Sequence, residues 1–291
     1  MLPLESVPNF SEGRNGRTIE AIGKALVTYG ARLLDVHADA DHNRSVFTLV
    51  GSEPELVEGV VAGVGCARER IDLRRHEGAH PRIGAADVVP FVPIRLDDLE
   101  RARAAAREVA VRLGDLGLPV FLYGGLDRGP AFFRRGGPEE LQARIDTGEL
   151  APDFGPKTLD PTAGAVLVAA RRPLIAFNVD LRTDDVEVAR AIASLVRERG
   201  GGFPGVRALG LDLPRAGLVQ VSMNVEDWEA APLHEIVARI ADEAGACGVE
   251  VAGSELVGLM PAGAAAAAAG VALRIEGFDS SRVLELRLLD D

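Results

Sequence analysis

The feature that most constrains the fold of this chain is one order of strands and helices that occurs twice. In the first half, four short apolar segments rich in β-branched residues have the character of strands: residues 4–9, 31–38, 45–51 and 86–94. Residues 16–29 and 53–71 carry apolar side chains at the spacing of amphipathic helices. The predicted order is βαββαβ, the split βαβ arrangement of ferredoxin-like domains.

The second half has the same order. Its predicted strands are residues 173–181, 206–213, 217–225 and 249–258, and its predicted helices are 184–199, 231–246 and 262–276. A closing strand is expected at 283–289. The first half adds a helix at 97–115 and a strand at 118–125, and then a loop-rich stretch from 125 to 163 with a solvated helix at 137–150. We therefore predict an α+β protein, an α/β sandwich of two ferredoxin-like subdomains at 1–172 and 173–291. Their mixed or antiparallel sheets are expected to face a ligand crevice.

Composition excludes several partners. The formal net charge of −12 argues against nucleic acid, because a phosphate-binding surface needs a basic excess. The longest apolar run, residues 261–273, is too short to span a bilayer, so no membrane partner is expected. Cys66 and Cys247 are the two cysteines, which predicts a cytoplasmic protein without a disulfide framework.

The segment "HEGAH" at 76–80 fits the H-E-x-x-H pattern of zinc metalloproteases. That pattern binds zinc only on a helix, where both histidines face the same way. Gly78 lies inside the segment and Pro81 follows it, so a helix could not continue through it. We therefore predict a loop without a metal.

Four of the five histidines, His37, His42, His76 and His80, lie at predicted strand ends or loops of the first half. Each one alone would be taken for a surface loop residue, but the cluster favours a functional site held by a rigid sheet. Arg44 and Arg82 lie in the same region and could bind an anionic ligand despite the acidic composition.

Several segments together resemble the formiminotransferase family. They are "VPNFSEGRN", "HNRSVFTLVG", "HEGAHPRIGAADVVPFVP", "VFLYGG", "PDFGP", "LIAFNV" and "GSELVGLMP", in family order from residue 7 to 261. The resemblance implies two ferredoxin-like subdomains that enclose a tunnel. It also implies transfer of the formimidoyl group from N-formimino-L-glutamate to N5 of tetrahydrofolate, the co-substrate. The cyclodeaminase domain of the vertebrate bifunctional relatives has no counterpart in these 291 residues.

The resemblance also implies which residues act, with His80 as the catalytic histidine. The expected substrate contacts are Asn9, Ser11, Glu12, Asn43, Arg44, His76, Arg82 and Gly84. The expected folate contacts are Gly155, Pro156, Lys157, Thr158, Leu159, Asp160, Pro161, Thr162, Ala163, Gly164 and Asn178. Position 37 is a histidine where family members often carry an aspartate that assists the catalytic histidine, so that role is left open. We expect no metal and a homodimer.

The implied chemistry suits these residue types. One imidazole can accept the proton that leaves N5 and deliver a proton to the departing glutamate nitrogen. The carboxylates of the substrates need cationic partners, which Arg44 and Arg82 provide. Among the histidines we expect His80 to matter most, His76 to position substrate and His42 to matter least. Two alternatives remain open at this point: a protein that acts on 5-formyltetrahydrofolate by formyl transfer or cyclisation, and a non-catalytic folate-binding protein.

Overall fold

The computed structural model describes residues 2–124 and 128–287. The chain divides into two compact units, Met1–Arg172 and Pro173–Asp291. Each unit combines helices with a β-sheet of its own. The predicted mixed α+β class is therefore confirmed.

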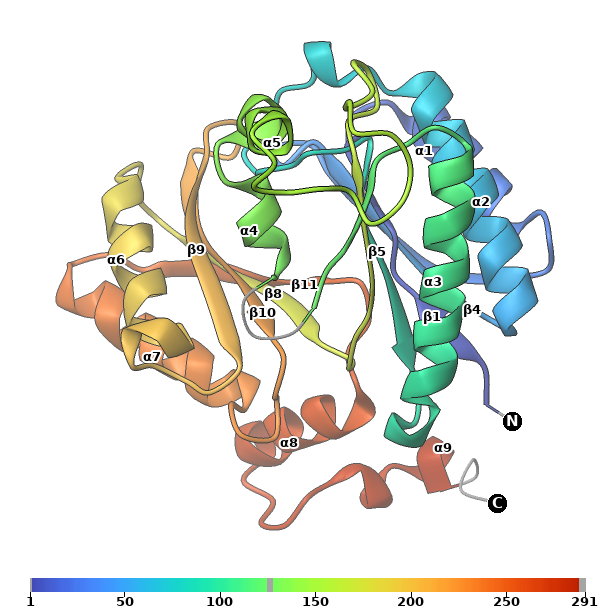
Figure 1. The fold of residues 1–291 in the computed structure, drawn as a ribbon. Coiled ribbons are helices and arrows are strands. Elements are labelled where there is room, and N and C mark those ends of the chain that lie inside the picture. The colour runs from blue at the N-terminus through green and yellow to red at the C-terminus, as the bar shows by residue number, and fades with distance from the viewer. Residues whose placement is uncertain (1, 125–127, 288–291) are drawn as a thin grey trace. The chain divides into compact units, whose positions relative to one another are not determined.

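The first unit is built on a seven-stranded mixed sheet (Figure 1). Its strands are β1 (Leu4–Ser6), β2 (Asn9–Phe10), β3 (Arg32–Asp39), β4 (Arg44–Gly51), β5 (Ala86–Pro93), β6 (Val120–Leu122) and β7 (Val166–Ala170). Both β1 and β2 pair antiparallel with β4 and β5, so these two short strands share one position in the sheet. The end of β2, the β3–β4 turn and the start of β5 therefore meet at the same end of the sheet.

Three long helices, α1 (Gly16–Val27), α2 (Glu53–Arg70) and α3 (Leu99–Asp115), cover one face of this sheet (Figure 1). Helix α1 begins at Gly16 because the Asn15 side chain accepts hydrogen bonds from the first-turn backbone amides. Helix α2 begins with a capping box, in which Ser52 and Glu55 satisfy each other's backbone amides. The shorter helices α4 (Pro130–Arg134) and α5 (Gly137–Asp146) follow β6.

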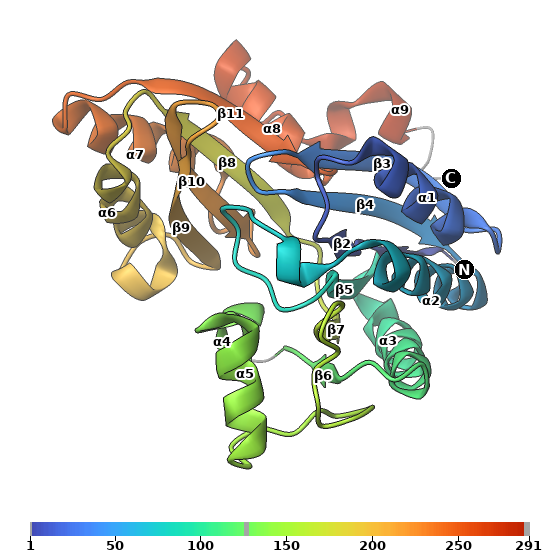
Figure 2. The same ribbon diagram turned by 90° about the horizontal axis from the view of Figure 1, so that it is seen from above.

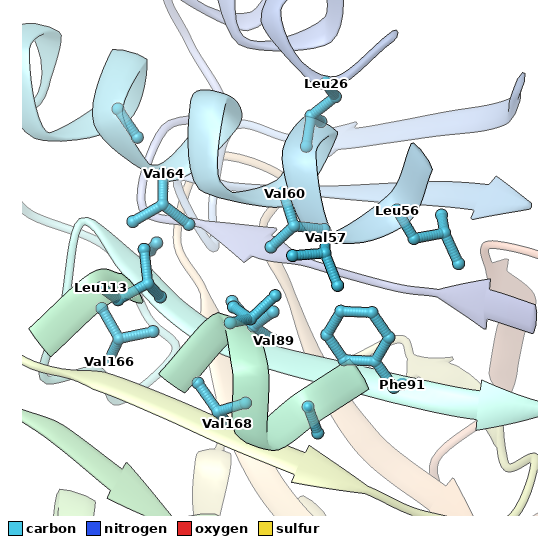
Figure 3. Close-up of a cluster of buried hydrophobic side chains, with 14 of the residues drawn as sticks. Leu26, Leu56, Val57, Val60, Val64, Val89, Phe91, Leu113, Val166 and Val168 are labelled. Atoms are coloured by element: carbon cyan, nitrogen blue, oxygen red, sulfur yellow. The ribbon is translucent and has the colours of Figure 1, made fainter. Parts of the chain in front are cut away.

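The core of the first unit lies between α2, α3 and the sheet (Figure 3). Val57, Val60 and Val64 follow one another at helical spacing along α2, and none is more than 1% exposed. They pack in one cluster with Val89 and Phe91 of β5. Burying a side chain of this size contributes roughly 1.5–3 kcal/mol. The sheet is thus a rigid support for the loops at its ends.

The register of β3 and β4 decides which side chains lie on the face away from this core. Val36 pairs with the core residue Phe47, so the alternate pair Asp39 and Arg44 projects from the opposite face. His37 pairs with Val46 and shares that face with Asp39 and Arg44. Polar and charged side chains therefore gather where the hairpin turns.

The second unit has a four-stranded antiparallel sheet in the order β11-β8-β10-β9 (Figure 2). Its strands are β8 (Ile175–Leu181), β9 (Val206–Leu213), β10 (Leu218–Val225) and β11 (Val251–Val257). Its helices are α6 (Val186–Val196), α7 (Leu233–Ala246), α8 (Ala262–Leu273) and α9 (Leu284–Arg287). Ile192 of α6 and Ile236 of α7 pack in one apolar cluster with Val221 of β10. Among residues 2–124 and 128–287, no helix is long and apolar enough to cross a membrane.

Three details differ from the prediction. The expected closing strand at 283–289 is wrong in its described part, because residues 284–287 form helix α9; positions 288 and 289 lie outside the described residues. In these four residues leucine alternates with a polar residue. A stretch this short fits both the helical and the strand period, so the pattern could not distinguish a helix from a strand. In the stretch from 128 to 163 the predicted helix at 137–150 is confirmed as α5, and the additional short helix α4 was not predicted. Strand β7 (Val166–Ala170) was not anticipated where the two halves were expected to join.

Candidate active site

Three loops of the first unit are joined by one asparagine at the tip of the β3–β4 hairpin. Asn43 has φ +46°, the left-handed conformation that asparagine tolerates in turns. Its side-chain oxygen accepts a hydrogen bond from Gly13 N at 2.9 Å, and its amide nitrogen donates to Glu77 O at 2.9 Å. The hairpin tip, the loop after β2 and the loop before β5 are thereby fixed together. A substrate contact from Asn43 stays a prediction.

The "HEGAH" segment is a loop and not a helix. His76 ends a short 3-10 helix at Leu73–Arg75, and no helix includes residues 77–82. Ala79 N donates to Asp41 O at 3.0 Å, so the loop lies along the hairpin tip. In the described part of the chain, no group of three or more His, Cys, Asp or Glu side chains could hold a metal ion. Because residues 77–82 are not helical, the two histidines are not held on one helix face as the zinc-protease pattern requires.

Gly78 is the point of closest approach between this loop and the hairpin. A Cβ atom at position 78 would lie 2.3 Å from the carbonyl oxygen of His42 and 2.8 Å from Arg82 Nη2. The carbonyl oxygen belongs to the backbone, so it could not move aside without shifting the turn. Glycine is therefore required for the loop to pack as it does.

We expect Gly78→Ala to push the loop away from the hairpin, destabilise the protein by about 1–3 kcal/mol and reduce activity. Gly65→Ala is the matched control, since Gly65 lies inside α2 with open space around it. That substitution is expected to be neutral or stabilising by up to about 1 kcal/mol. Thermal melts and turnover of both variants check this, and equal behaviour of the two would show that the close approach at Gly78 is unimportant.

His76 lies between the hairpin tip and Arg82. Its Nε2 lies 2.9 Å from the carbonyl oxygen of Asn43, and the Arg82 guanidinium contacts both of its ring nitrogens. Burial and the nearby Arg82 lower the pKa of His76 from its ordinary value. His76 is therefore a neutral residue that helps to orient Arg82.

His80 is partly buried at the centre of a cationic cluster. Burial lowers its pKa well below the ordinary histidine value, and the charges of Arg44, Arg134, His42 and Arg82 lower it further. The backbone carbonyl of His80 accepts a hydrogen bond from Arg82 Nε at 3.0 Å. A histidine in this environment is neutral near pH 7, which is the state that a general base requires.

The three arginines around His80 come from three different elements. Arg44 begins β4 and donates to the Asn9 side-chain oxygen, while Arg82 donates to backbone carbonyls, one of them His42 O at 3.1 Å. Burial lowers the pKa of Arg44 and of Arg82 to about 10. Arg134, on α4, is paired with Asp87 at 2.5 Å. Within residues 2–124 and 128–287, neither Arg44 nor Arg82 forms an ion pair with a carboxylate, and such buried guanidinium groups favour binding of an anion.

Asp87 holds this cluster to the sheet. One of its oxygens accepts a hydrogen bond from Ile83 N at 2.8 Å, and the other pairs with Arg134. The side chains of Asp87 and Arg134 are only 5% and 12% exposed. Sequence reasoning missed both residues. The available signal was the segment "PAFFRRGG", in which two adjacent phenylalanines indicate packing against the protein and therefore place Arg134 next to a buried side chain.

Other predicted substrate residues make contacts within the protein. The Ser11 hydroxyl donates to Gly84 O at 2.7 Å, and Glu12 accepts hydrogen bonds from the backbone amides of Arg14 and Asn15 at 2.8 Å. A Cβ at Gly84 would lie 1.9 Å from Ala165 O, so this glycine lets the segments that lead into β5 and β7 approach closely. These contacts support the local fold, and direct substrate binding by these residues stays a prediction.

The predicted folate loop, residues 155–164, belongs to the first unit. Gly155 and Gly164 have φ values of +79° and +69°, which glycine adopts without strain. Asp160 accepts hydrogen bonds from Thr162 N and Ala163 N at 2.9 and 3.0 Å and so forms a tight turn. The four residues 155–158 are exposed. The loop is thus internally ordered and leaves one side accessible.

Asn178 is the predicted folate residue that belongs to the second unit. It lies on β8, and its amide nitrogen donates to Glu255 Oε2 on β11 at 2.9 Å. Two positions along the same strand face, Asp180 accepts from Gln220 Nε2 at 2.9 Å. This sheet face therefore carries a row of hydrogen-bonded polar side chains, of which Asn178 and Gln220 are buried.

Comparison with known families matches nearly the whole chain. The model described as formiminotransferase domain, N-terminal subdomain, matches residues 3–171, and the formiminotransferase domain model matches residues 176–278. A glutamate formimidoyltransferase of Streptococcus pyogenes serotype M1 is 41% identical over 98% of each chain. One from Thermoplasma acidophilum is 38% identical, over 98% of this chain and 97% of the relative. The formimidoyltransferase-cyclodeaminase of Gallus gallus is 42% identical over 89% of this chain and 50% of its own length.

Proposed function

We infer, because this chain belongs to the formiminotransferase family, that it is a glutamate formimidoyltransferase. It transfers the formimidoyl group from N-formimino-L-glutamate to N5 of tetrahydrofolate in histidine degradation, and the products are 5-formimidoyltetrahydrofolate and glutamate. As a one-carbon transferase it uses tetrahydrofolate as co-substrate. The residue assignments and the assembly below are proposals that build on this activity.

The observation that best supports the activity is the convergence of three arginines on one neutral histidine. Formiminoglutamate carries two carboxylates, and guanidinium groups bind carboxylates through paired hydrogen bonds. Arg44 and Arg82 supply such groups beside His80, and Arg134 adds a third that is anchored by Asp87. We propose that this cluster binds the glutamate part of the donor, so that its formimidoyl carbon lies near His80.

His80 then moves one proton twice. N5 of tetrahydrofolate attacks the formimidoyl carbon, so a carbon–nitrogen bond forms while the C=N π electrons move onto the imino nitrogen, and the N5 proton passes to the neutral His80 imidazole. The tetrahedral intermediate collapses as the C=N double bond re-forms and the bond to the glutamate nitrogen breaks, and His80 returns the proton to that nitrogen. Acid–base catalysis by one side chain contributes about 10²–10⁴-fold. The neighbouring guanidinium groups prevent His80 from retaining the proton, which favours the second transfer.

We propose that residues 155–164 bind the folate, with Asn178 as a further contact. The exposed side of the 155–158 turn and the polar row around Asn178 on the second sheet support this assignment. Lys157 is exposed and is the basic side chain of this loop, so it is the proposed contact for the acidic folate tail. Substrate contacts from Asn9, Ser11, Glu12 and Gly84 stay predictions of the same kind.

The pairing order supports the proposal that each unit contains a ferredoxin-like subdomain. In the second unit the order β11-β8-β10-β9 places the first and last strands of a βαββαβ segment side by side. In the first unit β5 pairs with β1 and β2 in the same way. A homodimer and a cytoplasmic location also remain predictions, and sedimentation of the purified protein would test the former.

The activity is tested by mixing purified protein with tetrahydrofolate and N-formiminoglutamate and following product absorbance. We expect turnover to continue after exhaustive treatment with a chelator, because the chemistry assigned to His80 and the arginines needs no metal. Loss of activity on chelation that zinc restores would contradict this expectation.

The same assay distinguishes the donor. Protein supplied with 5-formyltetrahydrofolate and glutamate serves as the parallel reaction. We expect the formimidoyl donor to be used with the higher kcat/KM. A preference for the formyl compound would replace the proposed substrate while leaving the site intact. No turnover with either compound, from protein that still binds folate, would favour a binding protein.

A further inference from the structure

The turn between β3 and β4 fixes a carboxylate and an imidazole to each other. Asp39 Oδ1 accepts a hydrogen bond from the backbone nitrogen of His42 at 2.6 Å and lies 3.3 Å from His42 Nδ1. The His42 side chain is only 7% exposed. A carboxylate can only accept, so Nδ1 is the nitrogen of His42 that carries a hydrogen. Asp39 therefore orients both the backbone and the ring of His42.

The His42 ring in turn contacts the His80 ring. The ring centroids are 6.2 Å apart and the ring planes meet at 86°, an edge-to-face arrangement. Such packing restricts the orientations that the His80 imidazole can adopt. The loop that carries His80 is also hydrogen-bonded to the same hairpin tip, through Ala79 N to Asp41 O and Arg82 to His42 O. His80 is thus positioned from the hairpin as well as by its own backbone.

The positive groups around His80 disfavour its protonated form, so a nearby negative charge would stabilise that form. Arg44 of β4, Arg82 of its own loop, Arg134 of α4 and the charged form of His42 all disfavour its protonated form. Asp87 of β5 is the carboxylate paired with Arg134. A proton shuttle must nevertheless hold a proton between its two transfers. Asp39, which lies beyond His42, is placed to make that state less costly.

We propose that Asp39 and His42 act together as a positioning pair for His80. His42 orients the His80 imidazole, and Asp39 supplies, through His42, a negative charge that stabilises the protonated form of that imidazole. This proposal rests on the proposed function. It reverses the order expected from the sequence, which gave His42 the smallest role among the three site histidines. Neither residue needs to touch the substrate.

A simpler role for Asp39 is to cap the turn by accepting the His42 amide. Asp39→Asn separates the two roles, because an asparagine oxygen can accept the same hydrogen bond but carries no charge. His42→Phe makes the complementary change, since phenylalanine keeps an aromatic ring for edge-to-face packing but has no ring nitrogen. Asp35→Asn is the matched control. Asp35 lies on the same face of β3, four residues before Asp39, and pairs with Thr48.

The test measures kcat, KM and the titration of the His80 ring by NMR in wild type, Asp39→Asn, His42→Phe and the double variant. We expect Asp39→Asn to move the His80 titration to lower pH, because a nearby negative charge is lost. One unit of that shift would correspond to about a tenfold change in the protonation equilibrium. We expect kcat to fall by about tenfold with little change in KM. After His42→Phe, adding Asp39→Asn should cost little more, because Asp39 acts through His42.

Two results would overturn the proposal. The first is an Asp39→Asn protein whose His80 titration and kcat equal those of Asp35→Asn and wild type. The second is full additivity of the two substitutions, which would mean that Asp39 does not act through His42. The titration does not depend on turnover, so it decides the proposal even if the wild type proves inactive. Inactive wild-type protein would count against the proposed function instead.

Discussion

Replacing His80 with alanine should lower kcat for formimidoyl transfer by about 10²-fold or more. The variant loses the group that removes the N5 proton and protonates the glutamate nitrogen. The KM values for both substrates should change little, because a group that acts mainly in the transition state affects turnover more than binding. Steady-state kinetics with each substrate varied in turn would measure this.

His234→Ala is the matched control for that experiment. His234 lies on α7 of the second unit, whereas the catalytic residues proposed above belong to the first unit. We expect it to retain wild-type turnover. His76→Ala should lie between the two, because His76 orients Arg82 and does not transfer the proton. Wild-type turnover in His80→Ala would remove the proposed mechanism, because catalysis would then proceed without the His80 imidazole.

Removing the Asp87 carboxylate should cause the largest loss of stability at the site. Asp87→Ala leaves Arg134 buried without its ionic partner and Ile83 N without its acceptor. Breaking a buried ion pair in this way typically costs about 3–5 kcal/mol. Chemical denaturation of wild type and variant would measure the difference. Activity should fall as well, since Arg134 would no longer be held toward the donor site.

A double variant separates the structural role of this pair from its proposed role in binding. Replacing both partners, as in Asp87→Asn with Arg134→Met, avoids a lone buried charge, and such replacements are often nearly neutral for stability. We expect the double variant to recover most of the lost stability but to show a raised KM for formiminoglutamate. If KM were also restored, Arg134 would have no part in donor binding.

Much of the fold could be predicted because its signals are local. Residues 53–70 form α2 as the spacing of Val57, Val60 and Val64 indicated, and the capping pair Ser52 and Glu55 marks its start. The short helix at 284–287 could not be predicted, because four residues do not define a period. The strand β7 was missed because its pairing partners, β5 and β6, are distant in sequence.

The site was predictable only in part. The loop around Gly78 and Pro81 was predicted to be non-helical from local sterics, and that is confirmed. The sequence indicated Arg44 and Arg82 as candidate anion-binding residues in the region of the histidines, and the structure brings both close to His80. Arg134 could not be placed, because its position depends on the ion pair with Asp87, 47 residues away in the chain. The contact of His42 with Asp39 likewise depends on the geometry of one turn, which composition and periodicity do not reveal.

The environment of His80 also changes the expected pH dependence. Sequence alone suggests a group that titrates near the unperturbed histidine value of about 6.5. Burial and the surrounding arginines lower the pKa of His80 well below that value. A base acts in its neutral form, so activity should be present above the lowered pKa and lost as the pH falls through it. The acid limb of kcat/KM should therefore lie below the range expected for an exposed histidine.

The titration of His80 in the free wild-type protein is the most direct test that a neutral imidazole among guanidinium groups serves as the base. NMR signals of the imidazole would be followed from neutral to acidic pH and assigned by their absence in His80→Asn. We predict a midpoint well below 6.5, matched by the acid limb of kcat/KM. A midpoint at or above 6.5 would contradict the structure-based assignment, because His80 would then be substantially protonated at the pH where it must accept a proton.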